Sequence, residues 1–309
     1  MTSTIHIACN INSGYIRHCA IMLISLCKNN PGIDFQVHIL SDDLSSNDIK
    51  VLSQAVCNYP VKFKFYIQPA DFLENCPIDT EGHIDRSTYY RCFLSSLLPE
   101  DIDKILYLDC DIIIRGNIQE LWDTDITDYA VACVQDMWSA RQENYSRLQY
   151  DPAYSYFNAG VLLINMNYWR RHDIAGQSIG YITKYPERLE LNDQDVLNAL
   201  LHDKKRFVSF QWNMQDGFFR RRRRIEESTW PELDKAIQNP TVLHYTGGKK
   251  PWHYKSRHPY KKEYFVYLDM SPWSGWRPKT DYKALIMNNI NIFLAWIRIK
   301  KNKYRTIKK

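Results

Sequence analysis

The chain has 309 residues, of which 45% are hydrophobic and 24% charged, and its formal net charge is +5. This is the composition of an ordinary globular protein that can bury a substantial core in one large domain or two smaller ones. The small net charge argues neither for nucleic acid nor for an acidic substrate as a partner.

The eight cysteines are spread along the chain without a CxxC pair, and several lie within apolar runs. Free cysteine behaves as a small hydrophobe in such runs, so the pattern indicates a reduced, cytoplasmic protein. The first thirty residues lack the basic start, apolar stretch and small-residue cleavage site of a secretion signal. No segment reaches 18 consecutive apolar residues, and we therefore expect no membrane span.

Strands and helices alternate in the first part of the chain. Hydrophobic periodicity predicts strands over 4–11, 35–40 and 61–67, with helices over 15–27 and 45–55 between them. Ser45 followed three residues later by Asp48 is a plausible capping box for the second helix. The alternation favours parallel βαβ units and an α/β fold, in which ligands bind where strands end and loops begin.

The same pattern continues further along the chain. We predict a helix over 88–97 stopped by Pro99, a strand from Lys104, another strand over 157–166 and a helix over 191–201. No repeat, linker or composition shift appears before about residue 260. We therefore predict one main domain, residues 1–260, followed by an aromatic and basic extension, residues 261–309.

The strand from Lys104 ends in two aspartates, Asp109 and Asp111, within "LYLDCDIII". On a continuing strand they would point to opposite faces, whereas in a turn both carboxylates can surround one target. A divalent cation is a natural target because two buried carboxylates are costly unless a cation neutralises them. The alternative is that Asp109 ends the strand and Asp111 is merely solvated.

Three further stretches accompany this one: "YFNAGVLLIN", "LNDQDVLN" and "LHYTGGKKPWH". Their order and approximate spacing resemble those of glycosyltransferase family 8, over about residues 4–260. The resemblance implies a GT-A type nucleotide-sugar-binding fold, with a mostly parallel sheet flanked by helices. It also implies a retaining, metal-dependent enzyme that uses a nucleotide sugar.

By this resemblance, Asp109, Asp111 and His244 bind Mn²⁺, and the diphosphate of the donor completes the shell. Carboxylate, imidazole and phosphate oxygen suit Mn²⁺, or Mg²⁺, better than the thiolate-rich set of structural zinc. Taken alone, His244 would more often be a packed or surface histidine than a metal ligand.

The resemblance also predicts the residues that contact the UDP-sugar. Ala8 and Asn10 would bind the nucleoside, Cys110 would bring its backbone near the ribose, and Gly247 and Lys250 would hold the diphosphate. Asn10 stands where many members have aspartate. Compared with aspartate, asparagine keeps an acceptor oxygen but loses the negative charge. Taken alone, Asn10 would be a residue of a strand-end turn and "GGKKPW" a flexible basic turn.

On the sugar side, the resemblance predicts contacts from Arg91, Asn158, Ala159, Asp193 and Gln194. Asp193, Gln194 and Arg91 are its catalytic candidates. Without the resemblance, Arg91 could equally be a helix-surface arginine. For the second acid of "NDQD", Asp195, we predict capping or pairing within the helix.

Retention by a covalent route would need a carboxylate beneath the sugar ring, where the family pattern offers Gln194. We therefore favour a same-face route, in which the departing phosphate oxygen helps to deprotonate the acceptor hydroxyl. In that route Gln194 supports the developing positive charge through its carbonyl oxygen.

The C-terminal extension ends in an apolar helical repeat from Tyr282, including Trp296, and then in "KKNKYRTIKK". An amphipathic helix with a polybasic end is typical of attachment to an anionic membrane surface. The alternative is a helix packed on the main domain with a disordered end. The five arginines at 220–224 are read as solvated or as contacting phosphate or lipid headgroups rather than nucleic acid.

Together these features predict a retaining transferase that moves galactose or glucose from a UDP-sugar to a lipopolysaccharide-core or other surface-glycan acceptor. We expect it on the cytoplasmic face of the inner membrane, as a peripheral protein. Two alternatives stay open: a glycogenin-like enzyme that glycosylates itself on tyrosine, and a non-catalytic protein that binds nucleotides or glycans.

Overall fold

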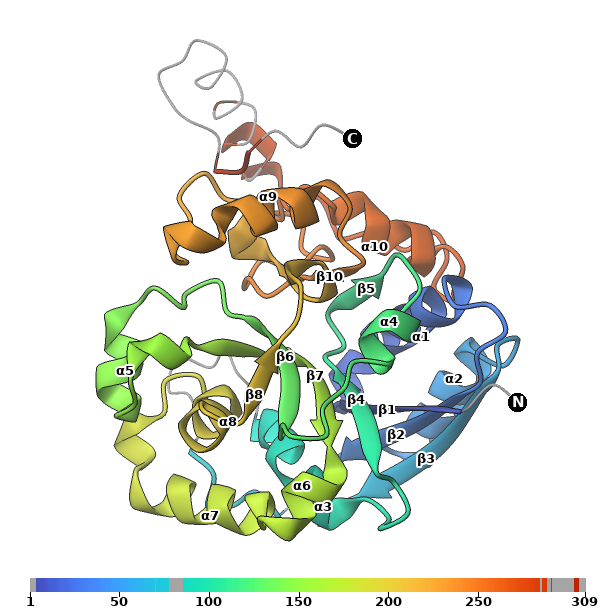
Figure 1. The fold of residues 1–309 in the computed structure, drawn as a ribbon. Coiled ribbons are helices and arrows are strands. Elements are labelled where there is room, and N and C mark those ends of the chain that lie inside the picture. Colours follow the sequence, from blue (N-terminus) through green and yellow to red (C-terminus); the bar gives the residue numbers. More distant parts are fainter. Residues whose placement is uncertain are drawn as a thin grey trace.

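A seven-stranded sheet forms the centre of the protein, with strand order β3-β2-β1-β4-β7-β6-β8 (Figure 1). The computed structural model describes residues 4–69, 71–77, 86–283, 285–287, 290 and 303–305. Strands β3, β2, β1 and β4 are parallel, β7 runs antiparallel to its neighbours, and β6 and β8 are again parallel. The strands are β1 Ile5–Asn10, β2 Phe35–Ser41, β3 Val61–Ile67, β4 Lys104–Leu108, β6 Val131–Gln135, β7 Phe157–Asn165 and β8 Lys205–Phe207.

A small sheet of order β5-β10-β9 lies beside the carboxyl end of β4. Its strands are β5 Ile112–Ile114, β9 Met214–Gln215 and β10 Val242–His244. Strand β10 pairs antiparallel with β5 and parallel with β9. The chain therefore passes from the large sheet into the small one through residues 109–111, the turn that carries the two predicted acids.

Helices cover both faces of the large sheet (Figure 1). The sheet separates two apolar cores, because alternate residues of a strand point to opposite faces. Ile7 and Cys9 of β1 pack into the core that contains α1, whereas Ala8 packs into the core that contains α3, α6, α7 and α8. The α-helices are α1 Ile16–Lys28, α2 Ser46–Ala55, α3 Leu94–Leu97, α4 Gln119–Trp122, α5 Gln142–Leu148, α6 Met166–Arg171, α7 Ile174–Lys184, α8 Asp193–Leu201, α9 Trp230–Gln238 and α10 Lys261–Leu268.

The predicted α/β class with a mostly parallel sheet is confirmed, and the expected strands and the helices expected over 15–27, 45–55 and 191–201 are present. The capping box of α2 forms as predicted: Ser45 Oγ accepts from the Asp48 amide at 3.2 Å, and Asp48 accepts from the Ser45 amide at 3.0 Å. One element differs. The predicted helix over 88–97 is a 3-10 helix over Arg86–Phe93 followed by only one α-helical turn, α3. Both helix types bring residues three apart to one face, so periodicity alone does not separate them.

The C-terminal region returns to the main body. Helix α10 packs on α1, where Tyr264 Oη lies 2.8 Å from Nδ1 of the buried His18. Residues 303–305 lie beside residues 219–221, joined by the Arg221 amide to Lys303 and the Arg305 amide to Phe219. Among the described residues, no helix is long and apolar enough to cross a membrane. Most of the predicted amphipathic helix, Trp296 included, lies outside the described residues.

Candidate functional site

The two predicted acids lie in a turn that is tied to strands on both sides. Strand β4 ends at Leu108, and the Asp109 amide donates to the Gly160 carbonyl of β7 at 2.9 Å. On the other side, the Tyr245 amide donates to the Asp111 carbonyl at 3.0 Å. The turn therefore allows both carboxylates to face the same space, which a continuing strand would prevent.

His244 reaches this turn because β10 pairs antiparallel with β5, which brings His244 opposite Ile112. Its Nε2 atom lies 3.1 Å from Asp111 Oδ1 and 3.6 Å from Asp109 Oδ2. One ligand atom from each of the three residues lies within 4.8 Å of the others. The three predicted metal ligands, separated by up to 135 positions (244 minus 109), thus form one cluster.

The orientation of the His244 ring suits a metal ligand. Nδ1 lies 2.9 Å from Asn213 Oδ1, and Asn213 in turn donates to Asn158 Oδ1 at 2.8 Å. Because an amide oxygen only accepts, Nδ1 carries the hydrogen, and in the neutral ring the Nε2 lone pair faces the two carboxylates. Three electron-rich atoms that converge in this way fit a divalent cation, and the oxygen-rich set suits Mn²⁺ or Mg²⁺.

Lys250 is the cation next to this cluster. Its ammonium donates to Asp111 and, at 2.7 Å, to the Tyr245 carbonyl. Burial raises the pKa of the Asp111 carboxyl, but Lys250 and His244 outweigh burial and hold that pKa well below its ordinary value. Asp111 is therefore ionised and can attract a second cation.

Arg91 is a buried clamp and not a helix-surface residue, with 5% of its surface exposed. Its guanidinium lies 2.9 Å from Asp109 Oδ1 and 2.8 Å from Asp193 Oδ2, and donates to the Ala159 carbonyl at 2.7 Å. Burial lowers the pKa of Arg91, and the two carboxylates more than reverse that effect. Burial also raises the pKa of Asp193 to about 6, against the opposing effect of Arg91.

Gln194 is held in a fixed orientation at the start of α8. Its Oε1 accepts from the Asn158 side chain and the Ala159 amide, each at 3.0 Å, while its Nε2 donates to Asp136 at 3.4 Å. The donors and acceptors around it determine which end of the amide is oxygen. The Gln194 carbonyl and the sugar-side residues Asn158 and Ala159 therefore form one hydrogen-bonded unit.

The second acid of "NDQD", Asp195, is fully buried and completely paired. It receives two hydrogen bonds from Arg147, at 2.7 and 2.9 Å, one from Tyr156 at 2.7 Å and two from the Glu190 and Leu191 amides. All of these partners lie outside its own helix, so the predicted pairing within the helix is wrong. Asp195 therefore stabilises the packing of α8 against α5 and is not available as a nucleophile.

One cavity of about 830 Å³ unites most of the predicted site residues, a size typical of ligand pockets. Its lining includes Asn10, Arg91, Asp109, Cys110, Asp111, Asn158, Asp193, Gln194, His244 and Lys250. Three predicted residues do not line it. Ala8 is buried in β1, Ala159 contributes its backbone to Gln194 and Arg91, and a Cβ at Gly247 would meet Asp216 at 3.4 Å.

Asp136 is a cavity residue that the sequence analysis missed. It follows strand β6 directly, as Asp109 follows β4, so an acid at a strand end was the available signal. It accepts from the Trp138 amide at 2.8 Å and from Asn158 at 3.0 Å. Burial raises its pKa, and these hydrogen bonds only partly offset that effect.

Asn10 and Cys110, which also line the cavity, lie where β1 and β4 end. Tyr107 Oη donates to Asn10 and, at 2.9 Å, to Asp109 Oδ1, which couples the predicted nucleoside end to the acidic turn. The Cys110 thiol lies against the buried thiols of Cys9 and Cys19. All eight cysteines are free.

Comparison with known proteins gives a consistent result. The model of the family described as Glycosyl transferase family 8 matches residues 6–256. General stress protein A of Bacillus subtilis (strain 168) is 28% identical over 274 residues, which is 87% of this chain and 94% of that protein. Lipopolysaccharide 1,3-galactosyltransferase of Salmonella typhimurium is 29% identical over 282 residues, 87% of this chain and 79% of that protein.

Among solved structures, the galactosyltransferase LgtC in complex with donor and acceptor sugar analogs superposes with a TM-score of 0.79. The two sequences are 25% identical, and the match covers 87% of this chain and 96% of LgtC. The predicted GT-A type fold is therefore confirmed.

Proposed function

The chain belongs to glycosyl transferase family 8, and from this premise we propose that it is a metal-dependent, retaining hexosyltransferase with a UDP-sugar donor. We propose galactose or glucose as the hexose and a lipopolysaccharide-core or other surface glycan as the acceptor. The observation that carries the proposal is the cavity in which Asp109, Asp111 and His244 converge next to Lys250 and Gln194.

In this proposal Asn10 and Cys110 contact the nucleoside, with Ala8 behind them in β1. Lys250 and the backbone at Gly247 hold the diphosphate, and Asp109, Asp111 and His244 hold a divalent cation, Mn²⁺ or Mg²⁺. The cation would supply Lewis-acid stabilisation of the leaving diphosphate. The Lys250 ammonium adds to that stabilisation because its charge faces the same group.

Arg91, Asn158, Ala159, Asp193 and Gln194 form the sugar side. The Arg91 guanidinium already binds Asp109, Asp193 and the Ala159 carbonyl. Its role in the proposal is therefore to position the two carboxylates. Asp193 then accepts from donor-sugar hydroxyls. Gln194 lies at the anomeric carbon, where its carbonyl faces the positive charge that develops as the leaving bond lengthens.

The reaction follows a same-face route. The bond from the anomeric carbon to the diphosphate breaks, the acceptor oxygen forms the new bond on the same face, and the departing phosphate oxygen takes the acceptor proton. A covalent route would need a free carboxylate beneath the ring. Asp195 is fully paired and outside the cavity lining, and Asp193 is paired with Arg91, so neither favours that route. A glycosyl adduct trapped on Asp193 or Asp195 of the intact enzyme would contradict it.

The hexose and acceptor classes rest on the relatives. The Salmonella relative is named for galactosyl transfer to lipopolysaccharide, and LgtC is a galactosyltransferase. For a lipopolysaccharide or other surface-glycan acceptor, we propose a peripheral position on the cytoplasmic face of the inner membrane. In this proposal residues 1–260 form the catalytic domain and residues 261–309 the attachment region, although α10 packs on α1.

The test is release of UDP from a panel of UDP-sugars with and without Mn²⁺, in the wild type and in Asp109→Asn. We expect release that depends on the metal and falls at least about 100-fold in the variant, because one of three ligands loses its charge. Asp203→Asn is the matched control, since Asp203 is an exposed acid whose one ion pair among the described residues is with its neighbour Lys204. Release that ignores both the metal and Asp109→Asn would overturn the site.

The same incubations distinguish the alternatives. Mass spectrometry of the protein after incubation with UDP-glucose would detect hexose on tyrosine if the enzyme glycosylates itself. Complete absence of UDP release with every UDP-sugar, together with retained UDP binding, would favour a non-catalytic nucleotide-binding protein.

A further inference from the structure

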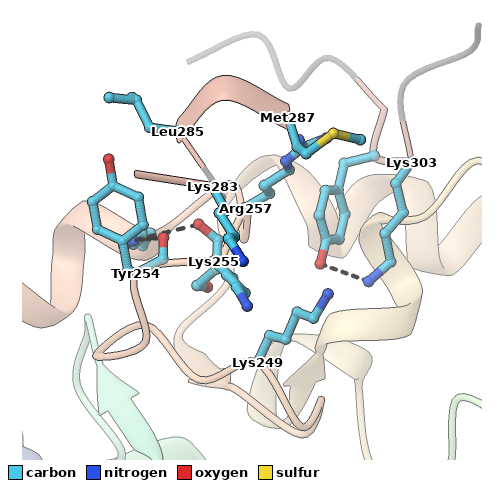
Figure 2. Close-up of a pocket in the computed structure, with 11 residues that line it drawn as sticks. Lys249, Tyr254, Lys255, Arg257, Lys283, Leu285, Met287 and Lys303 are labelled. Carbon is cyan, nitrogen blue, oxygen red and sulfur yellow. Dashed lines mark hydrogen bonds between the residues drawn. The ribbon is translucent and has the colours of Figure 1, made fainter. Parts of the chain in front are cut away.

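A second cavity, of about 670 Å³, lies between the loop that follows Lys250 and the C-terminal segment (Figure 2). The loop 249–261 forms one side, residues 283, 285 and 287 another, and residues 303–304 a third. Its lining residues are Lys249, Tyr254, Lys255, Ser256, Arg257, Lys261, Lys283, Leu285, Met287, Lys303 and Tyr304. We call it the basic cavity.

Six of these eleven residues are basic and none is acidic. Figure 2 shows the ammonium groups of Lys249 and Lys303 turned toward the same space. Packing so many cations around one hollow is unfavourable in the absence of a counter-charge, because each repels the others. An anion bound among the described lining residues would therefore be electrostatically favourable.

The internal partners account for only half of the six charges. Lys255 lies 3.1 Å from Asp281, Lys303 lies 3.8 Å from Asp216, and Lys261 donates to three backbone carbonyls of residues 253–256. Lys249, Arg257 and Lys283 have no carboxylate within 4.0 Å in the described part of the chain. Three positive charges therefore remain available to a ligand.

A buried hydroxyl gives independent evidence for a ligand. Ser256 is 7% exposed and lines the basic cavity, yet its Oγ has no hydrogen-bond partner among the described residues. A buried polar group without a partner costs free energy, and native structures usually satisfy it with a protein group, water or ligand. An oxyanion in the cavity would accept the Ser256 hydrogen.

The ionisation of the lining agrees with this view. Burial lowers the pKa of Lys303, and the positive charges of Arg220 and Lys249 lower this pKa further. Asp216 acts in the opposite direction and raises it. Burial also lowers the pKa of Lys261. A bound anion would reverse these effects, because opposite charge favours the ammonium form.

We propose that the basic cavity is a binding site for a phosphate group, separate from the donor site. Phosphate fits because its several oxygens can accept at once from a guanidinium, ammonium groups and a hydroxyl, as Arg257, Lys249 and Ser256 provide. The volume leaves room for the group to which the phosphate is attached. That group is a lipid headgroup or a soluble phosphorylated sugar.

The position of the cavity links it to the proposed reaction. We call the cavity of about 830 Å³ that holds Asp109, Asp111 and His244 the donor cavity. Lys250 lines the donor cavity and its neighbour Lys249 lines the basic cavity, so one loop separates the two sites. The apolar side chains of Tyr282 and Ile286, 74% and 59% exposed, lie in the same segment as the lining residue Lys283. The identity of the phosphate carrier rests on the proposed function, whereas phosphate binding itself does not.

The first experiment measures binding of inorganic phosphate by equilibrium dialysis, with saturating UDP and Mg²⁺ present to occupy the donor site. The test variant is Lys249→Gln combined with Arg257→Gln, and a second variant is Ser256→Ala. Lys262→Gln combined with Lys235→Gln is the control, because both lysines are exposed, outside the basic cavity and equal in charge. Binding of UDP to each variant verifies that it is folded.

We expect the test double variant to bind phosphate about 100-fold more weakly, at about tenfold for each charged donor removed, and the control to be unchanged. Ser256→Ala should lose a smaller part of the affinity. Failure of the wild type to bind phosphate beside UDP would overturn the proposal. Equal affinities of the test and control double variants would overturn it as well.

The second experiment identifies the carrier, by flotation with phosphatidylglycerol or phosphatidylcholine vesicles. If the phosphate belongs to a lipid, the wild type floats with phosphatidylglycerol vesicles, and the test double variant floats less than the control. If it belongs to a soluble sugar, the variant loses phosphate binding but floats like the control. The two proposals can fail separately. If the protein binds phosphate through Arg257 but turns over no UDP-sugar, the phosphate site is supported and only the proposed function is refuted.

Discussion

Replacing Gly160 with alanine tests whether the acidic turn and His244 form one close-packed site. Gly160 lies in β7 directly behind the cluster. A Cβ atom at this position would stand 2.2 Å from His244 Cε1 and 2.6 Å from Asp109 Oδ2. One added methyl group therefore presses on two of the three predicted metal ligands at the same time.

The size of the effect follows from these distances. Ordinary contact begins at 3.4 Å, so the imidazole must move by about 1.2 Å (3.4 minus 2.2) and the carboxylate oxygen by about 0.8 Å (3.4 minus 2.6). A metal site tolerates deviations of only about 0.2 Å in ligand distance. We expect Gly160→Ala to weaken Mn²⁺ binding by at least about 100-fold. Overpacking should cost about 1–3 kcal/mol of stability.

The assay is Mn²⁺ binding followed by the electron paramagnetic resonance signal of the free ion, with the melting temperature measured on the same samples. Gly180→Ala is the control, because Gly180 lies on the exposed side of α7 with nothing within 4 Å of an added Cβ. It should bind Mn²⁺ normally and gain about 0.5–1 kcal/mol, since alanine is the better helix former. Wild-type affinity and melting temperature in Gly160→Ala would refute the close packing of His244 and Asp109.

Three further predictions follow from the described contacts. Arg147→Ala leaves the buried Asp195 without its cation, so chemical denaturation should show that the free energy of unfolding falls by about 3–5 kcal/mol. Gln194→Ala should instead lower kcat, with a smaller effect on the free energy of unfolding. Burial lowers the pKa of both His18 and His38 from 6.5 to about 3. Below pH 6.5 the unfolded chain therefore binds protons at these histidines that the folded protein does not bind. The folded protein loses stability as the pH falls from 6.5 toward 3. Denaturation at pH 7 and pH 5 should differ by about 2 kcal/mol for each histidine, and His18→Gln should reduce the difference; an unchanged difference would exclude His18 as a source. Removal of metal with EDTA should abolish UDP release, and Mn²⁺ should restore it; full release in EDTA would contradict metal dependence.

Much of the fold could be predicted because its signals are local. The apolar run of β4 and the capping box at Ser45 are complete within a few neighbouring residues, so hydrophobic period and capping chemistry locate them. The 3-10 helix over Arg86–Phe93 was not predicted, because its conformation depends on the buried pairing of Arg91 with carboxylates that lie 18 and 102 residues further along (109 minus 91, 193 minus 91).

The site was accessible only in part. The family motifs named ten of the 22 residues that line the donor cavity, whereas Asp136 carried no motif and was missed. The basic cavity was also missed, since its cations come from segments as distant as Lys249 and Lys303. The arginine run at 220–224 is less solvated than expected, because Arg223, the fourth of its five residues, is buried against Asp234.

By itself, the sequence determined the α/β class, the order of strands and helices, and the presence of acids at the end of a buried strand, because periodicity and composition act over short distances along the chain. Only the tertiary structure decided which of those residues meet. Pairing of β10 with β5 brings His244 to Asp111, and Asn213 turns its ring toward the carboxylates. Such contacts depend on strand register and packing between distant segments, and no local pattern in the chain encodes them.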